Sequence, residues 1–291
     1  MSRAALLSMA CALFCAANDI IYKQTVSRDA GGKYAFYCMS SFVSLVFFFA
    51  FCLFGGGISL DAANVGFGMA AGVLSFFAYI FFLQSFGSGN TVLPVTVFRL
   101  NLVPGIILAV IFLHEELSPR RMLAVVLCIA GIVLIMAGKN LSNFSAKNIG
   151  AVFLALSLAA CLIAGLLNLL NKAAAMHGCD PVQLLFWRYF VVAFLSIVPF
   201  RLNRPAHPEP ERAKSGKTRA AISGVSGILS ALLNLCALEA LKTADLGMVV
   251  PITQMAFVPV SIFGWIALRE KTDLVKIAGL VCAVLSVFLI A

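Results

Sequence analysis

The chain of 291 residues is 62% hydrophobic and only 11% charged, with a mean hydropathy of +1.03. A soluble domain carries about 25% charged residues, so this composition excludes a surface that faces water throughout and predicts an integral membrane protein. The net charge of +9 does not indicate nucleic-acid binding, because the basic residues lie between apolar runs, where topology and anionic lipid headgroups account for them.

Apolar runs of about 20 residues, the length that a helix needs to cross the hydrocarbon core, follow one another along the chain. Helices are expected because lipid leaves the backbone of an open strand without partners. Ten spans are predicted, at residues 4–22, 34–54, 64–86, 91–113, 120–137, 148–172, 181–200, 218–241, 244–267 and 273–290. The first resembles a secretory signal, but its apolar run continues to Lys23, which favours a retained span.

Most connections between the spans are short, so consecutive helices are expected to be antiparallel neighbours. The stretch 201–219 is the exception, because it is rich in proline and charge and is predicted to be a solvated loop. Fourteen lysines and arginines fall on the face of this loop and five on the face of the N-terminus. The positive-inside rule then places the loop in the cytoplasm and both termini outside.

The two halves of the chain repeat each other at a spacing of 155 residues, which indicates an internal duplication. The matched segments are GVLS at 72–75 and GILS at 227–230, VP at 103–104 and 258–259, and the glutamates at 115 and 270. Each half, 1–138 and 148–291, has five predicted spans. Because five is odd, the second half enters the membrane from the opposite side, and the halves are predicted to be inverted repeats, the common plan of secondary transporters.

Each half also has a fourth span that contains a proline and ends in a short acidic turn. In the first half this turn contains Glu115, Leu117 and Ser118, and in the second half a looser version contains Glu270 and Thr272. On these residues the chain resembles the EamA-type members of the drug/metabolite transporter superfamily. The resemblance implies a ten-helix transporter with a central cavity, which moves metabolites, amino acids or drug-like compounds. It also implies cytoplasmic termini, in conflict with the charge count.

Arg99 is the leading candidate for a substrate-binding residue. It lies about 12 Å deep in its span by helical rise, where an ionised side chain costs about 2.5–3.5 kcal/mol. It could bind an anionic group of a substrate, or it could be paired with a carboxylate or with backbone carbonyls freed near the prolines. Its repeat counterpart is Gln254, so the predicted site is asymmetric.

Other polar residues within the spans complete the set of candidates. Arg188 could bind substrate or extend to the interface. Asp19 and Glu239 could each pair with an arginine, carry a coupling proton, or lie at the interface near the ends of their spans. The remaining polar candidates for the cavity wall, which could equally form hydrogen bonds between helices, are Asn18, Asn168, Asn234 and Gln254. Tyr79 could line the cavity or belong to an interfacial aromatic belt.

These features predict a secondary transporter, an exporter or exchanger of small molecules, in the inner cell membrane as a monomer or homodimer. A flippase for a lipid or lipid-linked sugar has the same architecture and stays open as the alternative. An enzyme is not expected, because the sequence contains no catalytic motif and no nucleotide-binding loop. No cofactor or metal is expected either, because the cysteines lack ligand spacing.

Overall fold

The computed structural model describes residues 2–26, 32–85, 92–116, 118–137, 151–203, 210–260, 262 and 274–290, and these residues form helices and no strand. The helices are α1 (Arg3–Val26), α2 (Gly32–Phe54), α3 (Ala62–Ser85), α4 (Val92–Arg99), α5 (Leu102–Leu113), α6 (Pro119–Ala137), α7 (Ala151–Met176), α8 (Pro181–Leu202), α9 (Pro210–Leu241), α10 (Leu246–Gln254) and α12 (Leu274–Ile290). The predicted turn at Glu270 and Thr272 and the start of the predicted span 148–172 lie outside the described residues.

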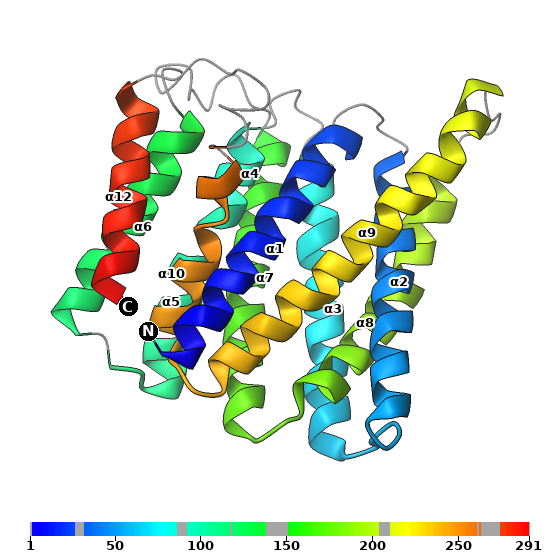
Figure 1. Cartoon of the computed structure of the whole chain (residues 1–291), viewed down its shortest axis with the longest axis horizontal. Coiled ribbons are helices and arrows are strands. Elements are labelled where there is room, and N and C mark those ends of the chain that lie inside the picture. The colour runs from blue at the N-terminus through cyan, green and yellow to red at the C-terminus, as the bar shows by residue number, and fades with distance from the viewer. Residues whose placement is uncertain are drawn as a thin grey trace.

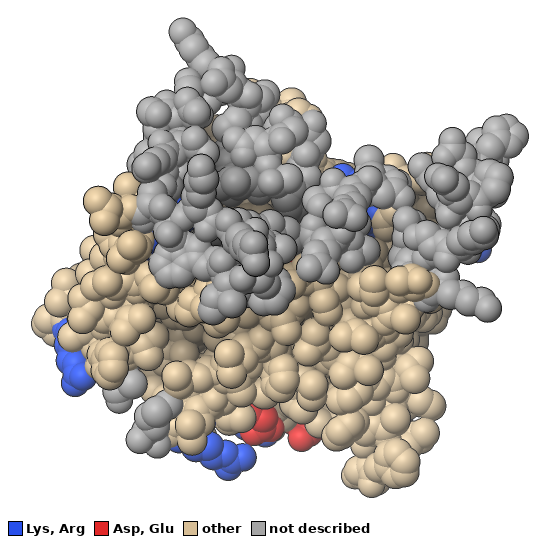
Figure 2. Space-filling view, turned by 45° about the horizontal axis from the view of Figure 1, so that its top comes forward, with Lys and Arg blue, Asp and Glu red and all other residues tan. Residues whose placement is uncertain are grey.

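Seven helical segments are long and apolar enough to cross a membrane, and two shorter apolar helices accompany them, within the described ranges. Figure 2 shows the surface that follows from this composition: a broad band of uncharged residues, with lysine, arginine and acidic side chains at its lower edge. The prediction of a multi-pass, all-helical membrane protein is therefore confirmed.

The helices of the two halves pack against one another in matching pairs. Helix α3 packs on α7 and α8, and its equivalent α9 packs on α1 and α2; likewise α4 packs on α7, and its equivalent α10 packs on α1. The equivalent helices α2 and α8, and α6 and α12, contact each other directly. In Figure 1, α1 runs away from the edge that holds both termini, and α7 runs back toward it. The halves thus interlock about an approximate two-fold relation.

The glycines of the matched motifs explain why these helices approach so closely. A Cβ on Gly72 would lie 2.7 Å from the Cβ of Val191 on α8, and a Cβ on Gly227 would lie 2.8 Å from the Cβ of Val43 on α2. Real side chains do not tolerate such distances. The repeated glycine therefore serves the same contact in each half, as small residues do between membrane helices.

The fourth span differs from the prediction, because it is divided into α4 and α5 by a break at residues 100–101. The cause is Pro104, which has no N–H to donate to the carbonyl of Leu100 four residues earlier. That carbonyl instead accepts a tighter bond from the N–H of Val103, at 2.9 Å.

The second half repeats this break. Pro259 leaves the carbonyl of Met255 without its usual partner, and the N–H of Val258 donates to it at 2.9 Å. Helix α10 accordingly ends at Gln254, as α4 ends at Arg99. The two polar candidates that stand 155 residues apart thus occupy the same place, at the end of a helix that a repeated proline interrupts.

A second difference concerns the predicted loop 201–219. Helix α9 begins at Pro210, so residues 210–219 of that stretch are helical. Residues 204–209 are not described. Proline is favourable at the first position of a helix, and the following Glu-Arg-Ala-Lys consists of good helix formers. The high charge of the stretch is compatible with a helix that extends beyond the apolar span.

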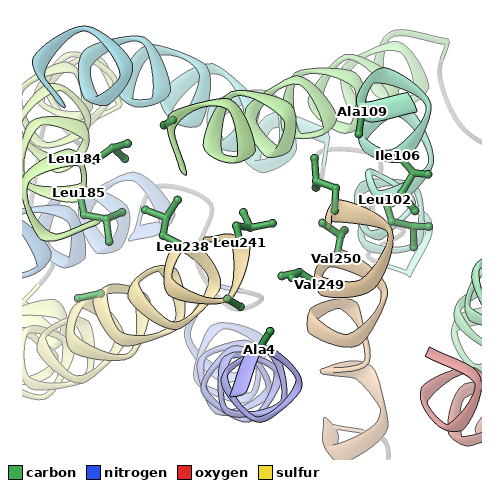
Figure 3. Close-up of a cluster of buried hydrophobic side chains, with 14 of the residues drawn as sticks. Ala4, Leu102, Ile106, Ala109, Leu184, Leu185, Leu238, Leu241, Val249 and Val250 are labelled. Atoms are coloured by element: carbon green, nitrogen blue, oxygen red, sulfur yellow. The ribbon is translucent and has the colours of Figure 1, made fainter. Parts of the chain in front are cut away.

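Apolar side chains fill the end of the bundle that holds the termini. Figure 3 shows them converging from α1, α5, α8, α9 and α10, with Leu185, Leu241 and Val250 among those that contribute. Leu185 and Leu102 have no accessible surface. This packed layer fills the interior of the bundle toward its terminal side.

Candidate functional site

Arg99, at the end of α4, forms an ion pair with Asp19 of α1. Its Nη1 also donates to the backbone carbonyl and to the side-chain Oε1 of Gln254, at 3.4 and 3.5 Å. Only 9% of the Arg99 side chain is exposed. A buried charge requires such partners, because its desolvation costs several kcal/mol.

The contact between Arg99 and Gln254 joins equivalent positions of the two halves, and a chain of amides extends it. The Nε2 of Gln254 donates to Oδ1 of Asn101 at 3.1 Å, and the Nδ2 of Asn168 on α7 donates to the same oxygen at 3.2 Å. We call Asp19, Arg99, Asn101, Asn168 and Gln254 the central polar cluster. It lies at the helix breaks of the two interrupted spans.

Asp19 is the more exposed member of the ion pair, with 36% of its side chain accessible. Asp19 is about 24 Å along α1 from Arg3 and about 10 Å from its end at Val26. The packed apolar layer includes Ala4 (Figure 3), which is near the start of α1 and so far from Asp19 along that helix. The cluster therefore combines a partly exposed carboxylate with a buried guanidinium.

A second polar group connects α1 to α9 and α8. Asn18, next to Asp19, donates to the hydroxyl of Ser230 at 3.2 Å and accepts from Ser226 at 2.6 Å. The hydroxyl of Tyr189 donates to the Ser230 carbonyl at 3.1 Å, and Asn234 donates to the Tyr189 hydroxyl at 3.0 Å. A polar seam thus leads from Asn18, the sequence neighbour of Asp19, to α8.

Arg188 stands at the far end of this seam and is 8% exposed. Its Nε and Nη1 have no hydrogen-bond partner within the described part of the chain. Its guanidinium carbon lies 6.0 Å from the centre of the Tyr189 ring. A cation–π contact is worth about 0.5–2 kcal/mol, less than the several kcal/mol that burial of a charge costs.

Comparison with known proteins identifies the architecture to which this geometry belongs. The family model described as the EamA-like transporter family matches residues 2–137 and 150–291. The chain belongs to the EamA-like transporter family. Members of this family are transporters rather than enzymes, and the resemblance stated from the sequence is confirmed.

A structural comparison agrees on the fold. One solved structure, described only as a crystal structure of a protein, aligns at 14% identity over 99% of this chain and 98% of its own length, with a TM-score of 0.76. At this identity the likeness concerns the fold alone. Comparison with curated proteins returns no match.

The candidate residues predicted from the sequence of this EamA-like chain fall into three places. Arg99, Asp19, Asn168 and Gln254 meet in the central polar cluster. Asn18, Asn234 and Arg188 lie along the seam, and Tyr79 stacks on Tyr37 with ring centres 4.5 Å apart. Glu239 lies apart from both groups, near the end of α9, and pairs with Lys242 at 3.2 Å.

Sequence reasoning missed Asn101, Ser226 and Ser230 as members of these networks. Asn101 could have been found from its place beside Arg99 and Pro104, because the freed backbone of a helix break attracts amides. Ser230 closes the repeated GILS motif, but serines in spans commonly bond to their own helix. Only the approach of α1 to α9 shows that these two serines hold Asn18.

The acidic turn on which the family resemblance rests has a structural role at the terminal side. The carboxylate of Glu115 accepts from the backbone N–H groups of Leu246 and Gly247, at 3.0 and 3.4 Å, and so caps the start of α10. Beside it, Arg121 pairs with Asp245 at 2.8 Å. These contacts join the first half of the chain to the second on the terminal side.

Proposed function

We propose that this EamA-like protein is a secondary transporter, an exporter or exchanger of small molecules, that works by alternating access at the central polar cluster. Its ten helices form two inverted five-helix repeats, residues 1–138 and 148–291, in the inner cell membrane. The observation that carries the proposal is the contact of Arg99 with Gln254. It joins equivalent helix ends of the two halves, so a movement of one half against the other must change this contact.

The two sides of the cluster support a conformation closed on one face. The apolar layer and the Glu115 cap hold the terminal side together, while the side chain of Asp19 is partly exposed. Alternating access requires the halves to separate on the terminal side and to close around Asp19 on the other. The contacts that must rearrange there are the packed apolar layer, the cap on α10 and the pair of Arg121 with Asp245.

Asp19 is the residue that we assign to proton coupling. When it is ionised, it neutralises Arg99; when it is protonated, Arg99 loses its partner and binds its remaining oxygen acceptors more strongly. A proton and a rearrangement of α4 against α1 are thereby linked. Glu239 is less suited to this role, because its partner Lys242 lies in the same surface turn.

Reconstituted vesicles test the proposal. The purified protein is placed in vesicles loaded with a pH-sensitive dye, and each amino acid and a set of small organic acids is added outside. We expect at least one of these compounds to move protons in wild type and in Glu239→Gln, and not in Asp19→Asn. Equal proton flux in Asp19→Asn removes that residue from coupling. Movement of a fluorescent lipid, without flux of any soluble compound, favours a flippase instead.

A further inference from the structure

The two buried arginines of the spans are not equivalent in charge. Arg99 has the carboxylate of Asp19 as its partner. Among the ion pairs of the described residues, none includes Arg188, and two of its three guanidinium nitrogens lack a hydrogen bond there. Arg188 is therefore a buried positive charge that has no counter-charge among the described residues.

The surroundings of Arg188 are aromatic and neutral. Within the described ranges, the hydroxyls of Tyr37 and Tyr189 are the titratable groups that interact with its charge, and Tyr37 stacks on Tyr79. A neutral phenol can accept a hydrogen bond, but it cannot balance a full charge. Native proteins rarely leave buried polar groups unpaired, and the exceptions call for an explanation such as an absent ligand.

We propose that Arg188 binds the carboxylate of a small monoanion, and that monocarboxylic acids with an apolar body are the substrate class. This inference rests on the proposed transport function. Carboxylate oxygens form strong, charge-assisted hydrogen bonds with a guanidinium. One negative charge balances one positive charge, whereas a phosphate dianion would leave an excess of buried charge. The rings of Tyr37, Tyr79 and Tyr189 suit an apolar body.

The place of Arg188 is consistent with a site on the transport path. Its neighbour Tyr189 bonds to the carbonyl of Ser230, and the hydroxyl of Ser230 accepts from Asn18, next to Asp19. An anion bound at Arg188 is thus connected through the polar seam to the proton-carrying residue. Arg99, already paired, is left to respond to the proton rather than to the anion.

Equilibrium binding to the full-length protein in detergent tests the assignment without requiring transport. The probes are acetate, benzoate and hydrocinnamate, with benzamide as the uncharged match of benzoate and inorganic phosphate as the dianion. We expect saturable binding of at least one carboxylate, with benzamide and phosphate at least tenfold weaker. Arg188→Gln should weaken that carboxylate at least tenfold. Arg201→Gln, which alters an exposed arginine at the end of the same helix, should leave its affinity unchanged.

Thermal unfolding without ligand separates loss of binding from loss of the fold. Because Arg188→Gln removes an unpaired buried charge, its unfolding temperature should equal or exceed that of wild type, and a large fall would show that Arg188 is a structural residue. Wild-type affinity in Arg188→Gln, equal affinity for benzamide and benzoate, or no binding of any carboxylate would each overturn the inference. Carboxylate binding without any flux counts against transport, whereas flux of a carboxylate that survives Arg188→Gln counts against this site alone.

Discussion

The ion pair of Asp19 and Arg99 allows a quantitative test of the central polar cluster. We consider Asp19→Asn, Arg99→Gln and the double variant. Asparagine keeps the shape of Asp19 and removes its charge, and glutamine at position 99 copies the residue at the equivalent position 254. The double variant has neither charge, so each single variant leaves one charge that the double variant lacks.

The magnitudes follow from burial. Breaking a fully buried pair by removing one partner costs about 3–5 kcal/mol. Asp19 is 36% exposed, so water screens part of the interaction, and Asp19→Asn should cost about 1–3 kcal/mol. Arg99→Gln leaves the exposed member of the pair, so it should cost about 1–2 kcal/mol. The double variant should be no less stable than Asp19→Asn, which corresponds to a coupling energy of about 1–2 kcal/mol.

The assay is unfolding of the purified proteins in one detergent, followed by loss of helical circular dichroism, with proton flux measured in parallel. We expect the double variant to be at least as stable as Asp19→Asn, and we expect proton flux to be lost in all three variants. If the costs of the two single substitutions simply add in the double variant, the pair contributes nothing, and the assignment of Arg99 and Asp19 to one functional unit is refuted.

Further predictions concern packing, capping and chemical reactivity. Gly227→Ala should destabilise the protein by about 1–3 kcal/mol, because the new Cβ meets the Ser40 carbonyl at 2.6 Å. Gly224→Ala, where nothing lies within 4 Å, should be neutral or stabilising by up to about 1 kcal/mol. The reverse order in thermal unfolding would contradict the packing argument. Glu115→Ala should cost about 0.5–2 kcal/mol through loss of the α10 cap, whereas Glu116→Ala at the neighbouring exposed position should change the unfolding temperature little. Burial raises the pKa of the Cys179 thiol, which lies between α7 and α8, so its thiolate is scarce at neutral pH. Its alkylation by a maleimide should therefore be slow until the protein is denatured. Rapid modification of the folded protein would show that the thiol is open to water.

The repeat and the depth of Arg99 were readable from the sequence because both depend on position along a single span. Hydropathy locates a charged residue relative to the ends of its helix, and a spacing of 155 residues pairs it with Gln254. The division of α4 from α5 was also encoded, in Pro104 and its repeat Pro259, although an apolar run alone suggests a continuous helix. A proline near the middle of an apolar span therefore indicates a break in its helix.

The partners of these residues could not be predicted, because they depend on which helices meet and at what height. Nothing in the order of residues shows that Asp19 on α1 reaches Arg99 on α4. Similarly, Arg188 has the same chemical character as Arg99, and only the packing of α8 against α2 and α3 distinguishes an unpaired guanidinium from a paired one. Hydropathy also placed the start of α9 too late, since it measures transfer to lipid and not helix formation in water.

The contact between Arg99 and Gln254 bears on how such a protein can evolve. In an assembly of two identical copies of one half, the residue at this position would face its own copy, and two arginines would repel each other. A neutral glutamine tolerates that arrangement. Once both halves are encoded in one gene, either copy can change alone, so a charge can appear on the axis of symmetry. Gene fusion thereby opens to selection a position that a symmetric dimer must keep uncharged.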